Sequence, residues 1–167
     1  MSVIPPSRRP RQPLTNLVRA ETLIKAPWGM PTAIHLDNPN WSYTSAGAIS
    51  LWVALDDVSE KNGCLFFMPG SHNDAELGRA AGGFGNINSI FQESDYPEWS
   101  EREMVPMVLN AGDATFRGPH TIALSVFYAQ LCLPWPTDSG MMAHAAAANM
   151  TPKPRRAMTC AFMPDGN

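Results

Sequence analysis

The triplet His35-Leu36-Asp37 places two potential metal ligands two positions apart in the sequence. In a β-strand, residues i and i+2 point to the same face, so this imidazole and this carboxylate could bind one ion. Two histidines and one carboxylate make the facial triad that binds Fe(II) and leaves three coordination positions open. A pair of solvated loop residues is the ordinary alternative for such a triplet. The chemistry therefore depends on a second histidine from a distant part of the chain.

Short strands are the elements that would have to position these side chains. Sixteen prolines and 12 glycines in 167 residues argue against long helices. Alternating or continuous apolar residues bounded by turn signals predict strands at residues 48–55, 64–68, 104–109, 113–116 and 156–163. Asn62-Gly63, directly before the second of these segments, favours a tight hairpin turn with positive φ. This pattern predicts an antiparallel sandwich or jelly roll.

Two further regions of the sequence carry no regular pattern. We expect residues 1–25, rich in proline and arginine at first, to form a poorly ordered N-terminal tail with a short helix-compatible patch at 14–24, followed by a single domain at 26–167. Residues 73–100 form a long excursion rich in Gly, Asn and Ser, a type of segment that is often disordered or covers an active site. Its aromatic side chains could meet an apolar substrate or anchor the excursion to the core; they are Phe84, Phe91, Tyr96 and Trp99.

Composition excludes several classes of function. A net charge of -3 gives no electrostatic footprint for nucleic acid or an anionic membrane. Three widely spaced cysteines indicate buried thiols in a reducing compartment rather than a disulfide framework or a zinc ribbon. No apolar run approaches the about 18 residues of a transmembrane helix, and the C-terminus is not a peroxisomal address. We therefore expect a cytoplasmic protein with a small-molecule substrate and no nucleic-acid or membrane partner; nothing in the sequence indicates an oligomeric state.

An ordered set of sequence blocks resembles the phytanoyl-CoA dioxygenase family. The blocks are Ile34-His35-Leu36-Asp37, Trp52-Val53-Ala54-Leu55-Asp56-Asp57, Asn62-Gly63-Cys64-Leu65, Pro69-Gly70-Ser71-His72, Ala111-Gly112-Asp113, and a closing stretch from His144 to Arg155. The resemblance covers about residues 26–116 and 140–166. It implies a mainly all-β fold, a double-stranded β-helix or cupin-like jelly roll that is shortened at its N-terminus. It also implies Fe(II) as metal, 2-oxoglutarate as cosubstrate and O2 as oxidant.

The resemblance also implies a ligand set. The positions that match the family's iron ligands are His35, Asp37 and His144. His120 competes with His144, but its spacing from the preceding blocks does not fit the family pattern. A leucine, not an arginine, stands eleven residues after His120, whereas an arginine stands eleven residues after His144. We interpret His72, in a Pro-Gly-Ser-His turn, as a residue that orders the adjacent loop.

Two more residues match positions that contact the cosubstrate in the family. The resemblance implies that Arg155 binds the far carboxylate of 2-oxoglutarate through a two-pronged, charge-assisted contact that suits a planar guanidinium. It implies that Trp52 walls the cosubstrate pocket. The alternative for Arg155 is an exposed base beside Lys153 and Arg156, and the alternative for Trp52 is an ordinary core aromatic.

The implied reaction is oxidative decarboxylation of 2-oxoglutarate to succinate and CO2, coupled to hydroxylation of an unactivated C–H bond in a small organic molecule or acyl thioester. Two features depart from the family pattern. Only 34 residues precede His35, and the spacing from Asp113 to His144 is far longer than usual. These departures leave two alternatives open: a catalytically silent jelly-roll module that binds a metal or ligand, and an incomplete fragment of such an enzyme.

The extra segment between Asp113 and His144 lies about at residues 117–139. It is too apolar for an ordinary surface loop, and family-like blocks stand on both sides of it. We hypothesise that it is a translated intron or another gene-model artefact, which sequencing of the transcript would test. If the segment is genuine, we expect it to pack as an added strand or a short helix.

Overall fold

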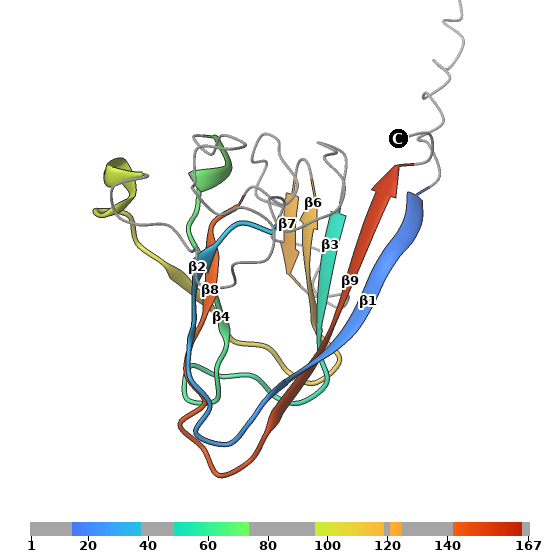
Figure 1. The fold of residues 1–167 in the computed structure, drawn as a ribbon, viewed down its shortest axis with the longest axis vertical. Coiled ribbons are helices and arrows are strands. Elements are labelled where there is room, and N and C mark those ends of the chain that lie inside the picture. Colours follow the sequence, from blue (N-terminus) through green and yellow to red (C-terminus); the bar gives the residue numbers. More distant parts are fainter. Residues whose placement is uncertain (1–14, 38–48, 74–95, 119–120, 125–141, 165–167) are drawn as a thin grey trace, which may run out of the picture.

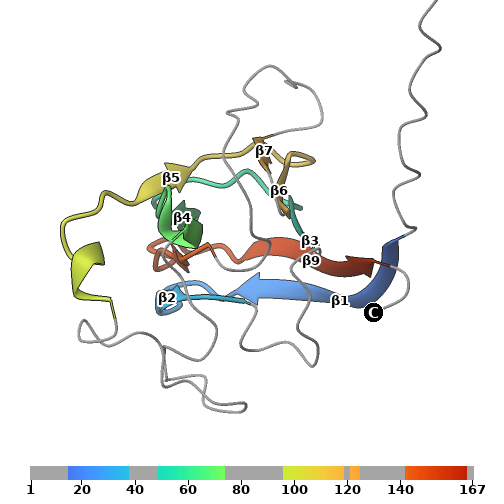
Figure 2. The same cartoon turned by 90° about the horizontal axis from the view of Figure 1, so that it is seen from above.

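A computed structural model describes residues 15–37, 49–73, 96–118, 121–124 and 142–164. These described residues form two antiparallel sheets that face each other (Figures 1 and 2). The five-stranded sheet has the order β1 (Thr15–Lys25), β9 (Arg155–Pro164), β3 (Ile49–Ala54), β6 (Ala114–Gly118), β7 (Thr121–Leu124). The four-stranded sheet has the order β2 (Thr32–His35), β8 (His144–Ala146), β4 (Leu65–Phe67), β5 (Val105–Met107). The prediction of an all-β jelly roll is confirmed.

The helices of the described residues are short, and all the longer regular elements are strands. Within the described ranges there are two 3-10 turns, η2 (Ser71–Asn73) and η3 (Pro97–Trp99). No helix in the described ranges is long and apolar enough to span a membrane. The five strands expected from the sequence correspond to β3, β4, β5, β6 and β9, within one or two residues at most ends.

The expected hairpin at Asn62-Gly63 is wrong, because the strands before and after it lie in different sheets. β3 pairs with β6 and β9, whereas β4 pairs with β5 and β8. The turn itself is tight, with Gly63 at φ 94° as predicted. A Cβ on Gly63 would lie 2.5 Å from Cδ of Lys25 and 2.9 Å from the carbonyl oxygen of Ala147. Glycine is required here because the chain crosses between the two sheets at close approach.

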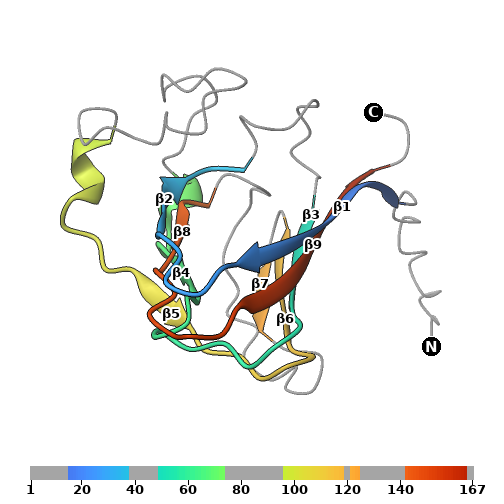
Figure 3. The same ribbon diagram turned by 60° about the horizontal axis from the view of Figure 1, so that its bottom comes forward.

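Strand β1 corrects the expectation of an N-terminal tail over residues 1–25. Thr15–Lys25 pairs along its length with β9, from Thr15 opposite Pro164 to Lys25 opposite Arg155 (Figure 3). The helix-compatible patch at 14–24 is therefore strand from residue 15, because backbone pairing with β9 overrides local propensity. Leu17 and Ile24 are exposed, so the apolar residues of β1 give no core-facing alternation that a sequence analysis could detect. Residues 1–14 lie outside the described ranges.

The segment expected to be an insertion at 117–139 is described only in part. Its first residues extend β6 and then form β7, which pairs with β6 from Gly118 opposite Thr121 to Thr115 opposite Leu124. The start of this segment is thus an added edge strand of the five-stranded sheet. Residues 119–120 and 125–141 lie outside the described ranges, and the artefact hypothesis stays untested.

Two apolar clusters pack against the four-stranded sheet. The inner cluster lies between the sheets, and its members include Trp52, Ala54, Leu65, Phe67, Ala146 and Ala157. The outer cluster consists of Leu36, Met68, Tyr96, Trp99 and Ala143. Its turn η3 lies on the side of the four-stranded sheet that faces away from the other sheet (Figures 1 and 2). The four-stranded sheet is therefore held between two apolar layers.

The outer cluster contains two aromatic residues of the excursion, Tyr96 and Trp99. Tyr96 and Trp99 are buried, and their rings stack with centroids 3.9 Å apart. They pack with Leu36, which stands between His35 and Asp37 in the sequence. The anchoring interpretation therefore fits Tyr96 and Trp99, whereas Phe84 and Phe91 lie outside the described residues.

Candidate metal centre

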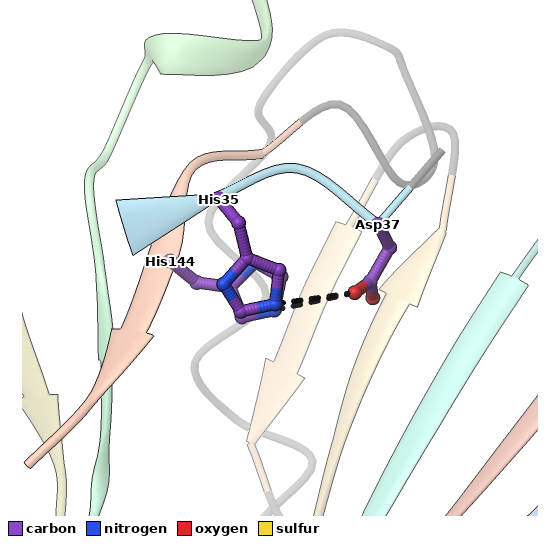
Figure 4. Close-up of side chains that lie close together, drawn as sticks. All are labelled: His35, Asp37 and His144. Carbon is purple, nitrogen blue, oxygen red and sulfur yellow. Dashed lines mark ion pairs between the residues drawn. The ribbon is translucent and has the colours of Figure 1, made fainter. Parts of the chain in front are cut away.

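The register of β2 and β8 brings two histidines together. His35, the last residue of β2, lies directly opposite His144, the first residue of β8. Side chains opposite each other on neighbouring strands share a face of the sheet. The two imidazole rings accordingly lie side by side, with centroids 4.2 Å apart (Figure 4). Asp37, just past the end of β2, turns its carboxylate toward both rings.

The three side chains converge through one atom each. Nε2 of His35 lies 3.6 Å from Oδ1 of Asp37, and Nε2 of His144 lies 3.5 Å from the same oxygen. All candidate ligand atoms lie within 4.8 Å of one another. Ligands about 2.1 Å from a shared ion lie roughly 3 Å apart. The observed separations approach that value and exceed the usual length of an N–H···O hydrogen bond.

Backbone carbonyls fix the tautomer of both histidines. Nδ1 of His35 lies 2.9 Å from the carbonyl oxygen of Ala33, and Nδ1 of His144 lies 3.0 Å from that of Met142. A carbonyl oxygen only accepts, so each Nδ1 carries the proton and donates it. In the neutral ring this leaves the Nε2 lone pair facing the carboxylate. Three electron-pair donors then converge, an arrangement that a bound cation stabilises.

The surroundings of the three ligands are unequal. His144 is 3% exposed, and its ring packs 5.8 Å from the ring of Phe67 in the inner cluster. The side chains of His35 and Asp37 keep 27% and 19% of their surface exposed. One ligand is therefore fixed in the core, while the other two border solvent and leave a route of entry for an ion and its ligands.

Ser71 is a supporting residue that the sequence analysis did not single out. Its buried hydroxyl donates to the carbonyl oxygen of Met68 at 2.8 Å and accepts from the backbone N–H of Ala143 at 2.9 Å. Met68 in turn donates its N–H to the carbonyl oxygen of Ala143. This network ties the end of β4 to the residue directly before His144. The Pro69-Gly70-Ser71-His72 block was the signal, although it was attributed to a turn around His72.

His72 and His120 are the other two histidines of the chain. His72 is buried in η2 and is not among the side chains that converge with His35, Asp37 and His144 in the described ranges. Its position in a short turn after β4 agrees with the interpretation as a loop-ordering residue. His120 lies outside the described residues.

Arg155 is a buried cation, in contrast to its neighbours in sequence. It is 3% exposed, whereas Lys153 and Arg156 are exposed, so the alternative of a surface base is wrong. Its Nη2 donates to the carbonyl oxygen of Gly63 at 2.9 Å, and its Cζ lies 5.1 Å from the centroid of the Trp52 ring. Its Nε and Nη1 are buried and have no hydrogen-bond partner. Buried donors of this kind indicate a missing acceptor.

Electrostatics at this end favour an anion. Burial lowers the pKa of Arg155 from its ordinary value. Burial, and then the charge of Arg155, lower the pKa of Lys25, which lies opposite Arg155 in the β1–β9 pair. The nearby carboxylate of Asp56 is bound by Arg156, with Nη2 to Oδ1 at 2.6 Å and Nε to Oδ2 at 3.0 Å. Arg155 thus offers two nitrogens with unpartnered N–H donors, Nε and Nη1, and no carboxylate of the described residues forms an ion pair with it.

Trp52 fits both interpretations of its role. It is 2% exposed and belongs to the inner cluster, so it is a core residue. Its ring also lies beneath the guanidinium of Arg155, where a cation–π contact holds the charged group in place.

The two sets of side chains fit a metal and a carboxylate ligand. Two imidazoles and one carboxylate, with further positions open, suit Fe(II) and related divalent ions. The buried guanidinium of Arg155, whose Nε and Nη1 have no hydrogen-bond partner, suits an anionic ligand such as a carboxylate.

Comparison with known proteins adds a family match. The family model described as "Phytanoyl-CoA dioxygenase (PhyH)" matches residues 9–123. That range contains His35, Asp37 and Trp52 but ends before His144 and Arg155. The placement of these last two residues at the site therefore depends on the strand register and not on the family match.

Each match covers only part of the similar protein's own chain. The chain is 37% identical over 89 residues to the dioxygenase lolE1 of Epichloe uncinata, a stretch of 53% of this chain and 31% of that protein. It is 39% identical over 70 residues to phytanoyl-CoA dioxygenase domain-containing protein 1 of Danio rerio, 40% of this chain and 23% of that protein.

Among solved structures, the epimerase SnoN in complex with Fe3+, alpha ketoglutarate and nogalamycin RO is similar at a TM-score of 0.65 and 26% identity. The match covers 90% of this chain and 50% of SnoN. The carbocyclase SnoK shares the fold at a TM-score of 0.66 and 21% identity, over 92% of this chain and 51% of SnoK. The chain thus spans about half the length of these structures and less of the curated relatives.

Proposed function

This chain belongs to the phytanoyl-CoA dioxygenase family, and we propose on that basis that it is an Fe(II)/2-oxoglutarate-dependent oxygenase. Enzymes of the family use Fe(II), 2-oxoglutarate and O2. The proposed reaction is hydroxylation of an unactivated C–H bond in a small organic molecule or acyl thioester. The chain covers about half of the similar solved structures or less, so the activity of a whole relative is a proposal here and not a transfer.

One observation carries the proposal. Nε2 of His35, Nε2 of His144 and Oδ1 of Asp37 meet within a few ångströms, although His144 is far from the other two in sequence. Both imidazoles are oriented by Nδ1–H donation to a carbonyl, the arrangement that metal-ligating histidines use. A structural ion pair would not need two rings oriented in this way.

In the proposed enzyme, each group has a defined task. His35, Asp37 and His144 would hold Fe(II), which when bound supplies activation of O2 and oxidative decarboxylation of 2-oxoglutarate. Arg155 binds the far carboxylate of the cosubstrate through its unpartnered N–H groups and so fixes its orientation. Trp52 holds the guanidinium in place from below. The inner cluster around Phe67 and Leu65 keeps water from this side of the centre.

The family and one similar protein support a proposal for the substrate class. The SnoN structure holds nogalamycin RO together with Fe3+ and alpha ketoglutarate, so at least one similar protein binds a small organic molecule. We propose the same class for this chain, with no nucleic-acid or membrane partner. The cytoplasmic location expected from the sequence stays a prediction.

Turnover of the cosubstrate tests this proposal. The chain, supplied with Fe(II), ascorbate, 2-oxoglutarate, air and a panel of candidate substrates, should form succinate, because the proposed reaction decarboxylates 2-oxoglutarate oxidatively. The His144→Ala variant should form none above the level of free iron. Binding of Fe(II) and 2-oxoglutarate without any succinate, with or without a panel of candidate substrates, would contradict the proposal and favour the silent binding module.

A further inference from the structure

Asp37 is the one member of the metal centre that lies outside a strand. His35 ends β2 and His144 begins β8, and the register of these two strands places both rings on one face. Asp37 follows after the end of β2, where strand pairing no longer sets the direction of a side chain (Figure 4). Its Oδ1 nevertheless lies 3.6 Å and 3.5 Å from the two Nε2 atoms. Contacts other than the β2–β8 pairing must therefore help to hold this carboxylate in place.

Leu36 connects β2 to Asp37 and is buried in the outer cluster. It is 2% exposed, whereas the side chains of its neighbours His35 and Asp37 keep 27% and 19% of their surface exposed. The two neighbours direct their side chains to the metal centre, while Leu36 packs with the outer cluster. A closely packed side chain restricts the backbone that carries it. The packing of Leu36 therefore limits where the next residue, Asp37, can place its carboxylate.

The largest side chains that pack with Leu36 in the outer cluster are an aromatic pair. Tyr96 and Trp99 are 3% and 5% exposed, and the planes of their stacked rings differ by 10°. The N–H of Trp99 donates to the carbonyl oxygen of Tyr96 at 2.9 Å, and the N–H of Arg102 donates to that of Trp99 at 3.0 Å. The two rings are thus joined by a hydrogen-bonded turn, η3, as well as by stacking. They form a stiff part of the cluster that contains Leu36.

The residue before His144 provides the internal comparison. Ala143 is also fully buried in the outer cluster, but hydrogen bonds fix its backbone in addition. Its N–H donates to Oγ of Ser71, and its carbonyl oxygen accepts from the N–H of Met68, both at 2.9 Å. His144 is thus positioned by strand register, by this network and by packing. Packing in the outer cluster carries a larger share of the positioning of Asp37, which lies beyond the strand.

We propose that Tyr96 and Trp99 are positioning residues for the metal centre, and that they act through Leu36 on the carboxylate of Asp37. This inference rests on the proposed function, because it assumes the metal that the function requires. Residues that support a ligand from behind change the affinity of a site without binding the ion. The coupling is reciprocal: a bound metal stabilises the packing of the aromatic pair by the same factor by which the pair favours metal binding.

The first test compares metal affinity with stability. Ni(II) is the probe, because it suits imidazole ligands and binds more tightly than Fe(II), so that weakened variants stay measurable in calorimetry. Trp99→Leu should bind Ni(II) about tenfold more weakly, the lower end of the effect of losing a supporting residue. Trp99→Phe, which keeps a ring that can stack, should stay within about threefold of the unsubstituted chain.

Leu109→Ala is the matched control. Leu109 is 4% exposed in the inner cluster and is not a sequence neighbour of any candidate ligand. Its replacement leaves a cavity and should lower the Tm, as Trp99→Leu should, but it should change Ni(II) affinity less than about twofold. If Leu109→Ala weakens Ni(II) binding as much as Trp99→Leu does, a general loss of stability explains the effect and the inference is wrong.

A double-mutant cycle tests the route through Asp37. Asp37→Ala should weaken Ni(II) binding, with the two imidazoles remaining as ligands. If the aromatic pair acts through this carboxylate, adding Trp99→Leu to Asp37→Ala should change the affinity less than about twofold, because coupled residues are not additive. The same loss in both backgrounds would mean that Trp99 acts on the histidines or on the whole fold, and it would overturn the inference.

Hydrogen exchange of the unsubstituted chain does not depend on the folding of any variant. Amides of residues 96–103 should exchange more slowly in saturating Ni(II), because the bound metal disfavours local opening of the aromatic pair. Residues 108–113, which contain no member of the outer cluster, should slow by a smaller factor. Equal exchange at 96–103 with and without bound Ni(II) would contradict the coupling.

The outcomes separate this inference from the function on which it rests. If the unsubstituted, folded chain binds neither Ni(II) nor Fe(II), the proposed function fails and the inference fails with it. If that chain binds Ni(II) and its exchange at residues 96–103 does not respond, only the inference fails. The same holds if folded Trp99→Leu binds Ni(II) as tightly as the unsubstituted chain.

Discussion

The two sheets contribute opposite chemistry to the space between them. The four-stranded sheet and the residues next to it supply the metal end, His35, Asp37 and His144, where electron-pair donors converge and two of the three side chains are partly exposed. The five-stranded sheet supplies the arginine end, where Arg155 is buried on Trp52 with two N–H groups unpartnered. The metal end presents electron-pair donors that suit a cation, and the arginine end presents N–H donors that suit an anion. A divalent metal that carries a dicarboxylate ligand would satisfy both at once.

The difference also shows how each end is stabilised. The ligands of the metal end are oriented by the backbone, through carbonyls that accept from both histidines and through the Ser71 network next to His144. The arginine end depends on side-chain packing in the inner cluster. We therefore expect substitutions at the metal end to abolish metal binding with little effect on the fold. Substitutions at the arginine end should change cosubstrate affinity and core stability together.

The largest effect is expected from His144→Ala. Loss of even an outer-shell partner costs a metal site about 10–100-fold in affinity, and loss of a direct ligand should exceed that. Calorimetric titration with Fe(II) or Mn(II) under anaerobic conditions measures the change. His120→Ala is the control and should bind metal like the unsubstituted chain. Retained metal affinity in His144→Ala, or loss in His120→Ala, would show that the ligand assignment is wrong.

The next largest effect is expected from Arg155→Met, which should change the affinity for 2-oxoglutarate but not the affinity for the metal. Arg155→Met removes a buried cation and keeps an unbranched side chain of similar length. We expect affinity for 2-oxoglutarate to fall by at least about 30-fold, since loss of one partner of a buried charge pair costs about 2–5 kcal/mol. Affinity for the metal alone should change little. A parallel loss of metal affinity would mean that the metal end depends on Arg155, and it would contradict the separation of the two ends.

A smaller effect is expected at the residue between these groups. Trp52→Phe keeps an aromatic face under Arg155 but weakens the cation–π contact, which is worth about 0.5–2 kcal/mol. Affinity for 2-oxoglutarate should fall severalfold, and the Tm should fall because the smaller ring leaves a gap in the inner cluster. If the Tm falls while the affinity stays constant, Trp52 is a core aromatic only.

The smallest effect concerns the surface ion pair between Asp56 and Arg156. Hydrogen bonds from Arg156 lower the pKa of Asp56 from 3.8 to about 2. Because the folded-state pKa lies below the ordinary value, the pair stabilises the fold above pH 3.8, and this contribution is lost as the pH falls toward 2. Asp56→Asn should flatten this part of the curve of Tm against pH. Glu101→Gln, at an exposed position, is the control, and an unchanged slope in Asp56→Asn would contradict the assignment.

The sequence predicted the fold where one face of a strand is buried. Strands such as β3 and β4 show apolar patterns that the inner cluster requires, so they were predicted. Strand β1 was missed because Leu17, Ile24 and most other described side chains on it are at least partly exposed. The hairpin at Gly63 was predicted wrongly because a glycine at positive φ indicates a turn but not which sheet the chain enters next.

The candidate site shows a similar division. The spacing of His35 and Asp37 suggested a possible metal pair, and the resemblance to the family implied their role together with those of His144 and Arg155. Their convergence is a property of strand register, which no local pattern records. Ser71 could not be predicted as a supporting residue, because a single hydroxyl in a turn is common. Only its hydrogen bonds in the folded chain identify it.

The most direct test is an anaerobic titration of the folded chain with Fe(II) and then 2-oxoglutarate, followed by visible absorption. If the metal end and the arginine end hold one metal–cosubstrate complex, a weak charge-transfer band should appear and saturate at one equivalent. The band should be absent in His144→Ala and should require more 2-oxoglutarate in Arg155→Met. A folded, monodisperse sample that binds neither Fe(II) nor 2-oxoglutarate and shows no band would contradict the account.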